Sequence, residues 1–239
     1  MLITAKLRAP VANRLLAALP QIEYQRLLPE LEHVTLPFAE VLYEPGASIR
    51  HVYFPGDSIV SLLSVVADFS TLEVGIIGNE GMAGISVFMG VGVSRTRALV
   101  QGAGTATRMK ASTLRKESEH MGALHRLLHR YTHSLLTQVS QTAACNRFHM
   151  VDARLARWLL MTHDRLKSAE FRVTQEFMSH MLGVRREGVT KAAGALQKNG
   201  LISYSRGHVT IHNRAGLEAV SCECYGIIKD ESNGYLKNG

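Results

Sequence analysis

The segment from Arg185 to Lys191 concentrates side chains that can form directed hydrogen bonds with base edges. An arginine can donate two hydrogen bonds to the O6 and N7 atoms of guanine, and a glutamate can accept one from the N4 amine of cytosine. The spacing predicts that Arg186, Glu187 and Lys191 face outward from the start of a helix and read bases. The alternative is that Glu187 and Lys191 form only an exposed i,i+4 ion pair worth a few tenths of a kcal/mol.

A second group of polar side chains suits phosphate rather than bases. Hydrogen bonds to phosphate oxygens hold a protein in register on a duplex but carry no sequence information. We expect such contacts from Thr174, Gln175, Arg185, Thr190, Ser205 and Arg206.

These side chains must be positioned by two helices and a hairpin. Thr174 is a good N-cap for the first helix, and Gly183 stops that helix in a tight turn. The second helix is predicted over about 185–198, and Asn199-Gly200 ends it. Residues 201–211 then read as a β-hairpin. The pattern predicts a helix-turn-helix with a wing, and the alternative is an ordinary helical hairpin.

The charge distribution favours the same part of the chain. The 239 residues carry a net charge of +7, and residues 146–220 alone carry +6. A localised basic block is typical of a nucleic-acid-binding surface, although charge alone also fits a merely solubilising surface.

Cysteine usage and hydropathy exclude several classes of protein. The chain has three cysteines, Cys145, Cys222 and Cys224. A small and odd number of cysteines argues against the disulfide framework of a secreted protein. No apolar run reaches 18 residues, and residues 1–20 lack the compact apolar region of a signal peptide. We therefore expect a cytoplasmic protein that has no membrane partner.

The first half of the chain reads as strands. Short β-branched runs alternate with turns such as Glu44-Pro45-Gly46 and Pro55-Gly56-Asp57. This spacing indicates an all-β barrel or sandwich over residues 1–110. Residues 221–239 form a C-terminal tail, whose last 15 residues look frayed.

A long helix is predicted within residues 111–145. Its apolar residues recur at spacings of three and four, as in a coiled-coil seam: Leu124, Leu128, Tyr131, Leu135 and Val139. We expect this stripe to form a homodimer interface; the alternative is that it packs only on its own β domain.

Four segments together resemble the Crp/Fnr family of transcription regulators: 52–63, 74–85, the long helix, and 183–202. The resemblance implies an α+β chain with an N-terminal antiparallel, jelly-roll-like β-roll sensor (1–110), a dimerisation helix (111–145), a C-terminal winged helix-turn-helix (146–220) and the tail (221–239). Arg186, Glu187 and Lys191 match the family's recognition helix, whereas Arg185 replaces a usual capping serine. The implied partners are a second copy of the chain, a pseudo-palindromic double-stranded DNA and RNA polymerase.

The resemblance also implies an effector pocket, formed here by Gly81, Gly84, Thr96, Arg97 and Ala98. Cyclic-nucleotide binders of the family have a Gly-Glu pair for the ribose and an Arg-Ser/Thr-Ala for the phosphate. The glutamate is missing here, and the arginine is displaced by one position. Cyclic nucleotides are therefore not expected, no cofactor is predicted, and the effector is unknown.

Weaker constellations remain. His125, His129 and His133 share a helix face that suits metal ligation geometrically, but we interpret them as exposed or sensor-facing side chains. Cys222-Glu223-Cys224 has too few partners for a zinc site, so no metal is predicted. No hydrolase or metalloprotease motif occurs, and we expect no enzyme.

Two functional hypotheses stay open. The first is a homodimeric, sequence-specific DNA-binding transcription regulator. The second is a small-molecule or metal sensor that acts through a protein partner, with the helix-turn-helix-like unit as an interaction module.

Overall fold

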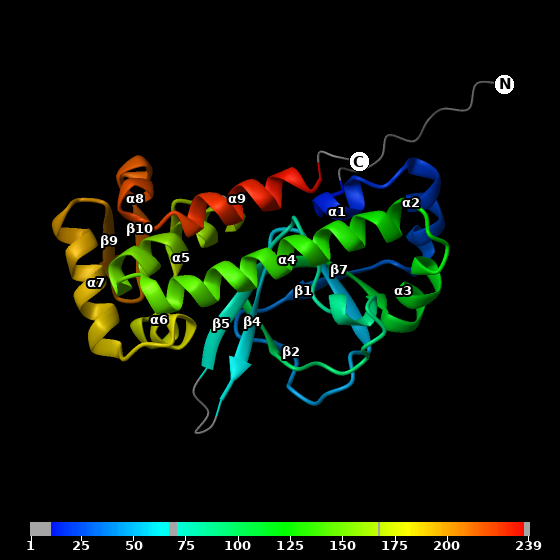
Figure 1. Ribbon diagram of the computed structural model, residues 1–239, viewed down its shortest axis with the longest axis horizontal. Helices are drawn as coiled ribbons and strands as arrows, with labels where there is room; N and C mark the ends of the chain where they lie inside the picture. Colours follow the sequence, from blue (N-terminus) through cyan, green and yellow to red (C-terminus); the bar gives the residue numbers. More distant parts are fainter. Residues whose placement is uncertain (1–10, 67–70, 167, 237–239) are drawn as a thin grey trace.

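The computed structural model describes residues 11–66, 71–166 and 168–236. The expectation about a signal peptide in residues 1–20 therefore falls partly outside the described residues. Figure 1 shows the β-sheets and a cluster of small helices and strands side by side, with the long helix α4 running along both. The chain is α+β, as the sequence predicts.

Two antiparallel sheets form the N-terminal part. One has the strand order β1-β7-β3 and the other the order β2-β6-β4-β5. The strands are β1 (Glu32–Leu36), β2 (Val41–Tyr43), β3 (His51–Pro55), β4 (Ile59–Val65), β5 (Thr71–Ile77), β6 (Arg97–Gly102) and β7 (Gly104–Lys110). The turn before β3 uses Pro45 and Gly46, and Gly46 has a φ of 84°, which glycine adopts without steric cost.

Short helices flank these sheets. They are α1 (Arg14–Ala17), α2 (Gln21–Leu27), η1 (Leu28–Glu30), η3 (Ile85–Val87) and α3 (Ala111–Ser118). The carboxylate of Glu23 in α2 accepts hydrogen bonds from the backbone N–H groups of Ala123 (2.8 Å) and Leu124 (3.0 Å). A carboxylate at this place satisfies donors that have no partner within a helix, so α2 fixes the start of α4.

Helix α4 (Ala123–Phe148) has 26 residues and is thus about 39 Å long. A two-residue connection leads into α5 (Val151–Leu166). The apolar side of α5 packs on the sheet of β4 and β5, where Trp158 and Leu159 share a core with Ile59 and Ile76. The β-roll and the C-terminal helices therefore share one apolar interface.

The C-terminal part contains β8 (Glu170–Arg172), α6 (Gln175–Leu182), α7 (Arg186–Lys198), β9 (Ile202–Ser205), β10 (His208–Ile211) and α8 (Arg214–Val220). Its small sheet has the order β8-β10-β9. None of the helices within the described ranges is long and apolar enough to cross a membrane.

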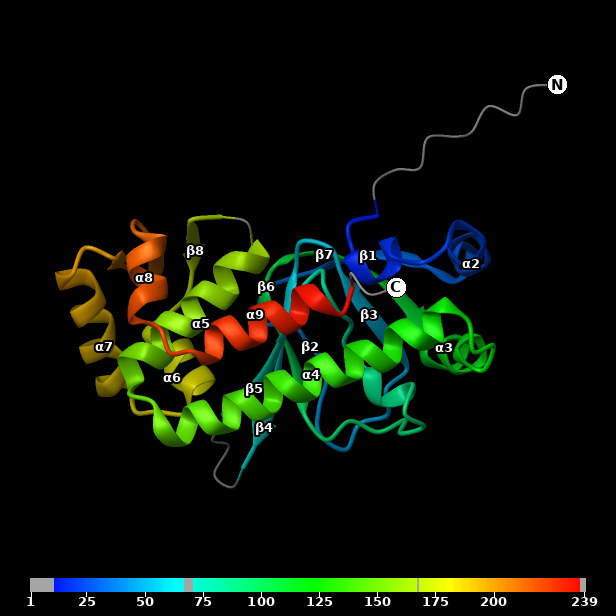
Figure 2. The same cartoon turned by 45° about the horizontal axis from the view of Figure 1, so that its top comes forward.

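The expectation of a frayed tail is wrong for residues 225–236, and residues 237–239 lie outside the described part of the chain. Residues Cys224–Gly234 form helix α9, which packs along α4 and also contacts α5 (Figure 2). Tyr225, Ile228 and Tyr235 lie on its inner side and are 3–6% exposed. The segment is otherwise polar, so its composition suggested fraying. Its few buried apolar residues recur at helical spacing, and their packing holds the helix in place.

Candidate nucleic-acid interface

Helix α6 begins and ends where the sequence predicts. The Thr174 hydroxyl accepts a hydrogen bond from the backbone N–H of Phe177 (3.0 Å), so it caps the helix. Gly183 ends the helix in the left-handed conformation, at φ 60° and ψ 40°. An added Cβ there would lie 2.8 Å from the Leu72 side chain of β5, so the glycine also permits close packing on the β-roll.

Helix α7 directs its apolar side inward and its polar side into solvent. Val189, Ala192, Ala193 and Leu196 are at most 4% exposed. The residues predicted to contact DNA from this helix are all exposed, namely Arg185, Arg186, Glu187, Thr190 and Lys191. Arg185 stands at the N-cap position without a side-chain capping bond, as its replacement of a serine implies.

The first turns of α6 and α7 are joined by a hydrogen bond between side chains. The Thr190 hydroxyl lies 2.9 Å from Gln175 Oε1 and 3.0 Å from the carbonyl oxygen of Arg186. In contrast, within the described part of the chain no ion pair joins Glu187 to Lys191. Both charged groups are thus free to meet a ligand.

The predicted wing is a two-residue hairpin. Ser205 pairs with His208, and the two residues between them, Arg206 and Gly207, have φ values of 50° and 78°. Positive φ at both central positions is the turn type that matches the twist of a hairpin. The backbone N–H of Val173 donates to the carbonyl of Gly207 (2.8 Å), which holds the wing turn beside the start of α6.

This contact creates an open surface groove. Its lining is Thr174, Gln175, Glu176, Arg186, Tyr204, Arg206 and Gly207, and its volume is about 440 Å³. It therefore unites Arg186 with three of the residues predicted to hold phosphate, whereas Arg185, Thr190 and Ser205 lie exposed on the flanking elements. Sequence reasoning missed Glu176 and Tyr204, because the register of the wing against α6 is not visible in local spacing.

Several residues of the predicted effector pocket contact other parts of the same chain. The Tyr131 ring fills the space beside Gly81, where an added Cβ would lie 2.4 Å from the ring, and its hydroxyl donates to the carbonyl of Met82 (2.8 Å). Arg97 pairs with Glu44 (2.8 Å) on an exposed edge. Ala98 is fully buried, Thr96 is half-buried, and Gly84 packs against Val52 with φ 96°.

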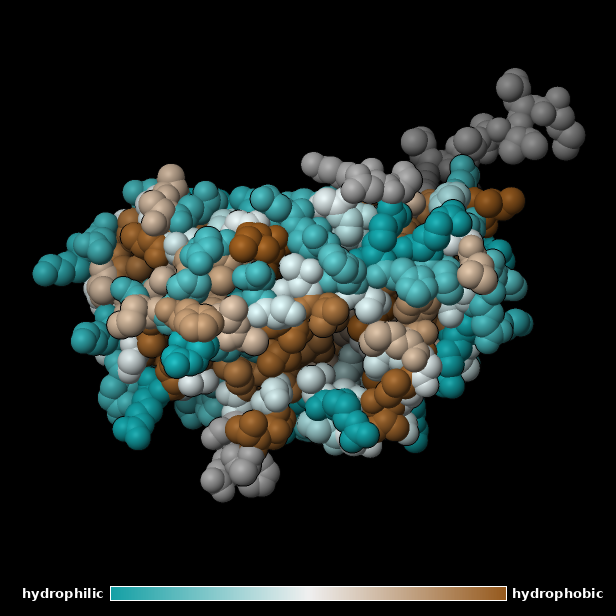
Figure 3. Space-filling view, viewed as in Figure 1, coloured by the Kyte–Doolittle hydropathy of each residue, from teal (hydrophilic) through white to brown (hydrophobic). Residues whose placement is uncertain are grey.

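The predicted dimer seam is corrected in part. Leu124, Leu128 and Tyr131 are 0–4% exposed in the single chain, because they pack into its own β-roll core. Leu135 and Val139 are half-buried. The outward side of α4 instead carries Leu136, which is 62% exposed. Figure 3 shows apolar side chains gathered beside the middle of α4, within a largely hydrophilic surface.

Two other groups of ligand-type side chains fall along α4 and α9. The rings of His125 and His129 pack edge-to-face on each other and on Phe88, and His133 pairs with Glu231 (3.2 Å). The three cysteines, however, come together with a histidine that sequence reasoning did not single out, His149. Cys145 and His149 belong to the end of α4, and Cys222 and Cys224 to the start of α9.

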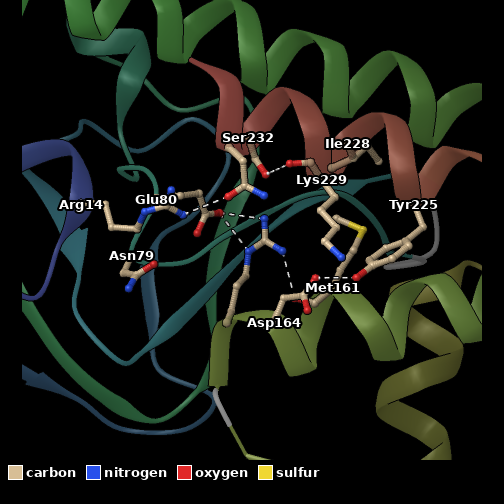
Figure 4. Close-up of a pocket in the computed structure, with 11 residues that line it drawn as sticks. Arg14, Asn79, Glu80, Met161, Asp164, Tyr225, Ile228, Lys229 and Ser232 are labelled. Atoms are coloured by element: carbon tan, nitrogen blue, oxygen red, sulfur yellow. Dashed lines mark hydrogen bonds and ion pairs between the residues drawn. The ribbon is translucent and has the colours of Figure 1, made fainter. Parts of the chain in front are cut away.

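A pocket of about 240 Å³ lies where α5, α9 and residues 79–80 meet (Figure 4). Its charged groups are paired with protein atoms. Arg165 binds Glu80 (2.7 Å), and Asp164 accepts from the Tyr225 hydroxyl (2.9 Å) and pairs with Arg214 (2.6 Å). This pocket therefore works as a polar junction between the β-roll and the C-terminal helices.

Comparisons with known proteins agree with this architecture. The Crp-like helix-turn-helix domain family matches residues 153–220. No curated protein matches the sequence. Among solved structures, FixK2 from Bradyrhizobium japonicum has a TM-score of 0.68 at 16% identity, covering 80% of this chain and 98% of that one.

Two further structures support the same fold. A putative Crp/Fnr-family transcriptional regulator from Eubacterium rectale has a TM-score of 0.69 at 14% identity, over 87% of this chain and 98% of that one. TTHB099, a CRP-family transcriptional regulator from Thermus thermophilus, has a TM-score of 0.64 at 20% identity, covering 79% of this chain and 96% of that one. Residues 153–220 therefore match the Crp-like helix-turn-helix domain family, and most of the chain has the fold of the Crp/Fnr transcription regulators.

Proposed function

We propose that the protein is a homodimeric transcription regulator without catalytic activity that binds a specific sequence of double-stranded DNA. The observation that carries the proposal is the exposed start of α7, where Arg186 lines the groove. Within the described ranges, Glu187 and Lys191 form no ion pair with the rest of the chain. The N-terminal turns of such a helix enter the major groove, where Arg and Glu distinguish bases. Thr174, Gln175, Arg185, Thr190, Ser205 and Arg206 surround it as phosphate-binding groups.

The proposed dimer contact is the outward side of α4 around Leu136, Val139 and the partly buried Leu135. Leu136 is 62% exposed, and apolar side chains gather beside the middle of α4 (Figure 3). A contiguous apolar patch of this kind marks an interaction surface. A two-fold dimer presents one recognition helix per subunit, so the target is a pseudo-palindrome. Its half-sites lie about 10 bp, or roughly 34 Å, apart.

RNA polymerase is the partner through which such a complex would change transcription, and no membrane takes part. No effector is assigned. The ion pair of Arg97 with Glu44 and the Tyr131 ring against Gly81 both support the expectation that cyclic nucleotides do not bind. Calorimetry with cyclic AMP and cyclic GMP tests this; micromolar binding that Arg97→Ala abolishes would overturn it.

Selection of bound sequences from random double-stranded DNA tests the function itself. The proposal predicts enrichment of one pseudo-palindrome with the stated spacing, and binding that weakens steeply with salt. If no sequence is enriched and binding to DNA is absent, the helix-turn-helix unit is an interaction module of a sensor that acts through a protein.

A further inference from the structure

The four ligand-type side chains at the α4–α9 junction form a compact, mostly buried cluster. Cys145, Cys222 and Cys224 are 0–7% exposed and form no disulfide, and the side chain of His149 is 23% exposed. Their ligand atoms, one imidazole nitrogen and three sulfurs, all lie within 4.8 Å of one another. Sulfur and imidazole nitrogen are the ligands that zinc prefers, and three Cys with one His is a known composition of structural zinc sites.

The distances match one tetrahedral metal ion. Zinc–sulfur bonds of about 2.3 Å and zinc–nitrogen bonds of about 2.0 Å place tetrahedral ligands roughly 3.5–3.8 Å apart. The Sγ atoms of Cys145 and Cys222 are 3.4 Å apart, and the Sγ of Cys224 is 3.7 Å from Nδ1 of His149. A small rearrangement of side chains is therefore enough to centre an ion among the four atoms.

The histidine is also oriented as a metal ligand. Its Nδ1 points into the cluster, while its Nε2 lies 3.2 Å from the carboxylate of Glu223. A carboxylate that accepts the second ring N–H fixes the tautomer and orients the other nitrogen for a metal, as in carboxylate–histidine–zinc arrangements. Glu223 lies between two of the cysteines, so a single short segment supplies two ligands and their supporting group.

The charge of the surroundings suits the complex. Three thiolates, one neutral imidazole and Zn²⁺ together carry a net charge of −1. The buried guanidinium of Arg157 acts electrostatically on all three thiols, and Arg154 acts on two of them. Among the residues that the structure describes, neither arginine has a carboxylate within ion-pair distance, and both leave Nε without a hydrogen bond. An anionic metal–thiolate centre would offset the positive charge of these two buried guanidinium groups.

The geometry points to a structural zinc site formed by Cys145, His149, Cys222 and Cys224. Four protein ligands close the coordination sphere, which is the arrangement of structural rather than catalytic zinc. Two ligands lie just before α5, and two lie just after α8. The ion would therefore join the two ends of the 151–220 segment, fastening the helix-turn-helix domain to α4 and α9. This inference is independent of DNA binding.

Metal analysis of the full-length protein, purified under reducing conditions, tests the inference. We expect one zinc per chain, or uptake of one equivalent of added Zn²⁺ after treatment with a chelator and reductant. Removal of the metal should lower the melting temperature, and Zn²⁺ should restore it. Loading with Co²⁺ should give the visible absorption of a tetrahedral thiolate complex.

Matched variants separate the site from general effects on folding. Glu223→Gln keeps all four proposed ligands and changes only the group that orients His149. It should lower zinc affinity about 10- to 100-fold. Glu231→Gln is the matched control. The Glu231 carboxylate lies 3.2 Å from Nδ1 of His133, a similar contact between α4 and α9, and its loss should leave zinc affinity unchanged. Cys224→Ser should lower the affinity further and change the Co²⁺ spectrum.

Three results would overturn the inference. The first is reduced protein that contains no metal and takes up none. The second is bound zinc that the Cys222→Ser, Cys224→Ser double variant retains. The third is a Cys145–Cys222 disulfide that forms in air in wild-type protein while added zinc never protects these thiols, which would identify a redox pair instead.

Discussion

Glu73 is a buried carboxyl group at the contact between β5 and α5. Burial, the largest influence, raises its pKa to about 7 from an ordinary value of 4.5, despite hydrogen bonds from Ser61 (2.6 Å) and Trp158 (3.0 Å). The Ser61 hydroxyl also lies 2.5 Å from Gln101 Oε1, yet it has one proton to donate. Protonated Glu73 can donate to Ser61, which then donates to Gln101, so the neutral acid satisfies every group.

This assignment predicts how stability depends on pH. The unfolded chain releases the Glu73 proton near pH 4.5, whereas the folded chain keeps it until about pH 7. The contribution of this group to the free energy of unfolding should therefore fall by about 3 kcal/mol as pH rises between these values. Glu73→Gln mimics the protonated acid and should remove that loss. Urea unfolding of both proteins at pH 5 and pH 8 checks it; an equal pH dependence in both would contradict the assignment.

At the residue scale, the sequence predicts the direction of a side chain where that direction depends on one helix alone. Arg186, Glu187 and Lys191 lie within one and a half helical turns, so helical periodicity alone places them outward. Glu73 and the zinc-type cluster were missed for the opposite reason. Cys145 and Cys222 are 77 residues apart in the chain, and only the packing of α9 on α4 brings them together. The Cys222-Glu223-Cys224 spacing was the available signal.

At the scale of elements, helix α4 has two different apolar sides. The sequence predicted the helix and its stripe, but periodicity cannot say which side meets the chain's own β-roll. Leu128 lies on the inner side and is fully buried, whereas Leu136 lies on the outer side. A seam assigned to Leu128 therefore confused core packing with subunit contact.

Two charge substitutions separate these roles. Leu136→Asp should produce a folded monomer, because the charge disrupts only the proposed subunit contact. Leu128→Asp should instead unfold the chain or lower its stability severely, because it buries a carboxylate in the core. Sedimentation and circular dichroism distinguish the two. A Leu136→Asp protein that stays dimeric would show that this side of α4 is not the seam.

The junction between the β-roll and α5 rests on a second buried contact, the ion pair of Glu80 with Arg165. Their side chains are 10% and 8% exposed, so removing one partner leaves a buried charge. Glu80→Ala should lower the free energy of unfolding by about 3–5 kcal/mol. In the exposed pair of Arg108 with Glu32, where Glu32 is 59% exposed, Glu32→Ala should lower the free energy of unfolding far less, because water and salt screen the two charges. Equal losses in urea unfolding would argue that Glu80 and Arg165 do not hold the junction.

At the scale of the whole molecule, the order of β-roll, long helix and winged helix-turn-helix was predictable from sequence. A local sequence signal marks each part: Pro and Gly turns between short strands, the periodicity of one long helix, and the capping residues of a helix pair. No local signal shows how the parts pack on one another, because that packing depends on contacts such as Leu72 with Gly183 and Phe38 with Phe177. Helix α9 could not be predicted from local sequence either, because its position depends on its packing against α4.

The dimer should read bases with α7 and hold phosphates with the wing. Arg186→Ala should therefore cost about 1–3 kcal/mol per half-site on the selected DNA and relax preference at one G·C pair. Arg206→Ala should weaken binding to all sequences alike and reduce the salt dependence by about one unit. Because Arg206 has a positive φ, Arg206→Asn, which tolerates that conformation better, controls for strain in the turn.

The most direct test of base readout by α7 is the ratio of two affinities, one for the selected pseudo-palindrome and one for a scrambled duplex. This ratio is measured for wild type, Arg186→Ala and Arg206→Ala at one salt concentration. We predict a high ratio for wild type, at least about 10³-fold, a ratio reduced at least tenfold by Arg186→Ala, and a ratio unchanged by Arg206→Ala. A wild-type ratio near one, or an identical sequence-independent loss in both variants, would contradict base readout by α7 and leave the basic block as an electrostatic footprint alone.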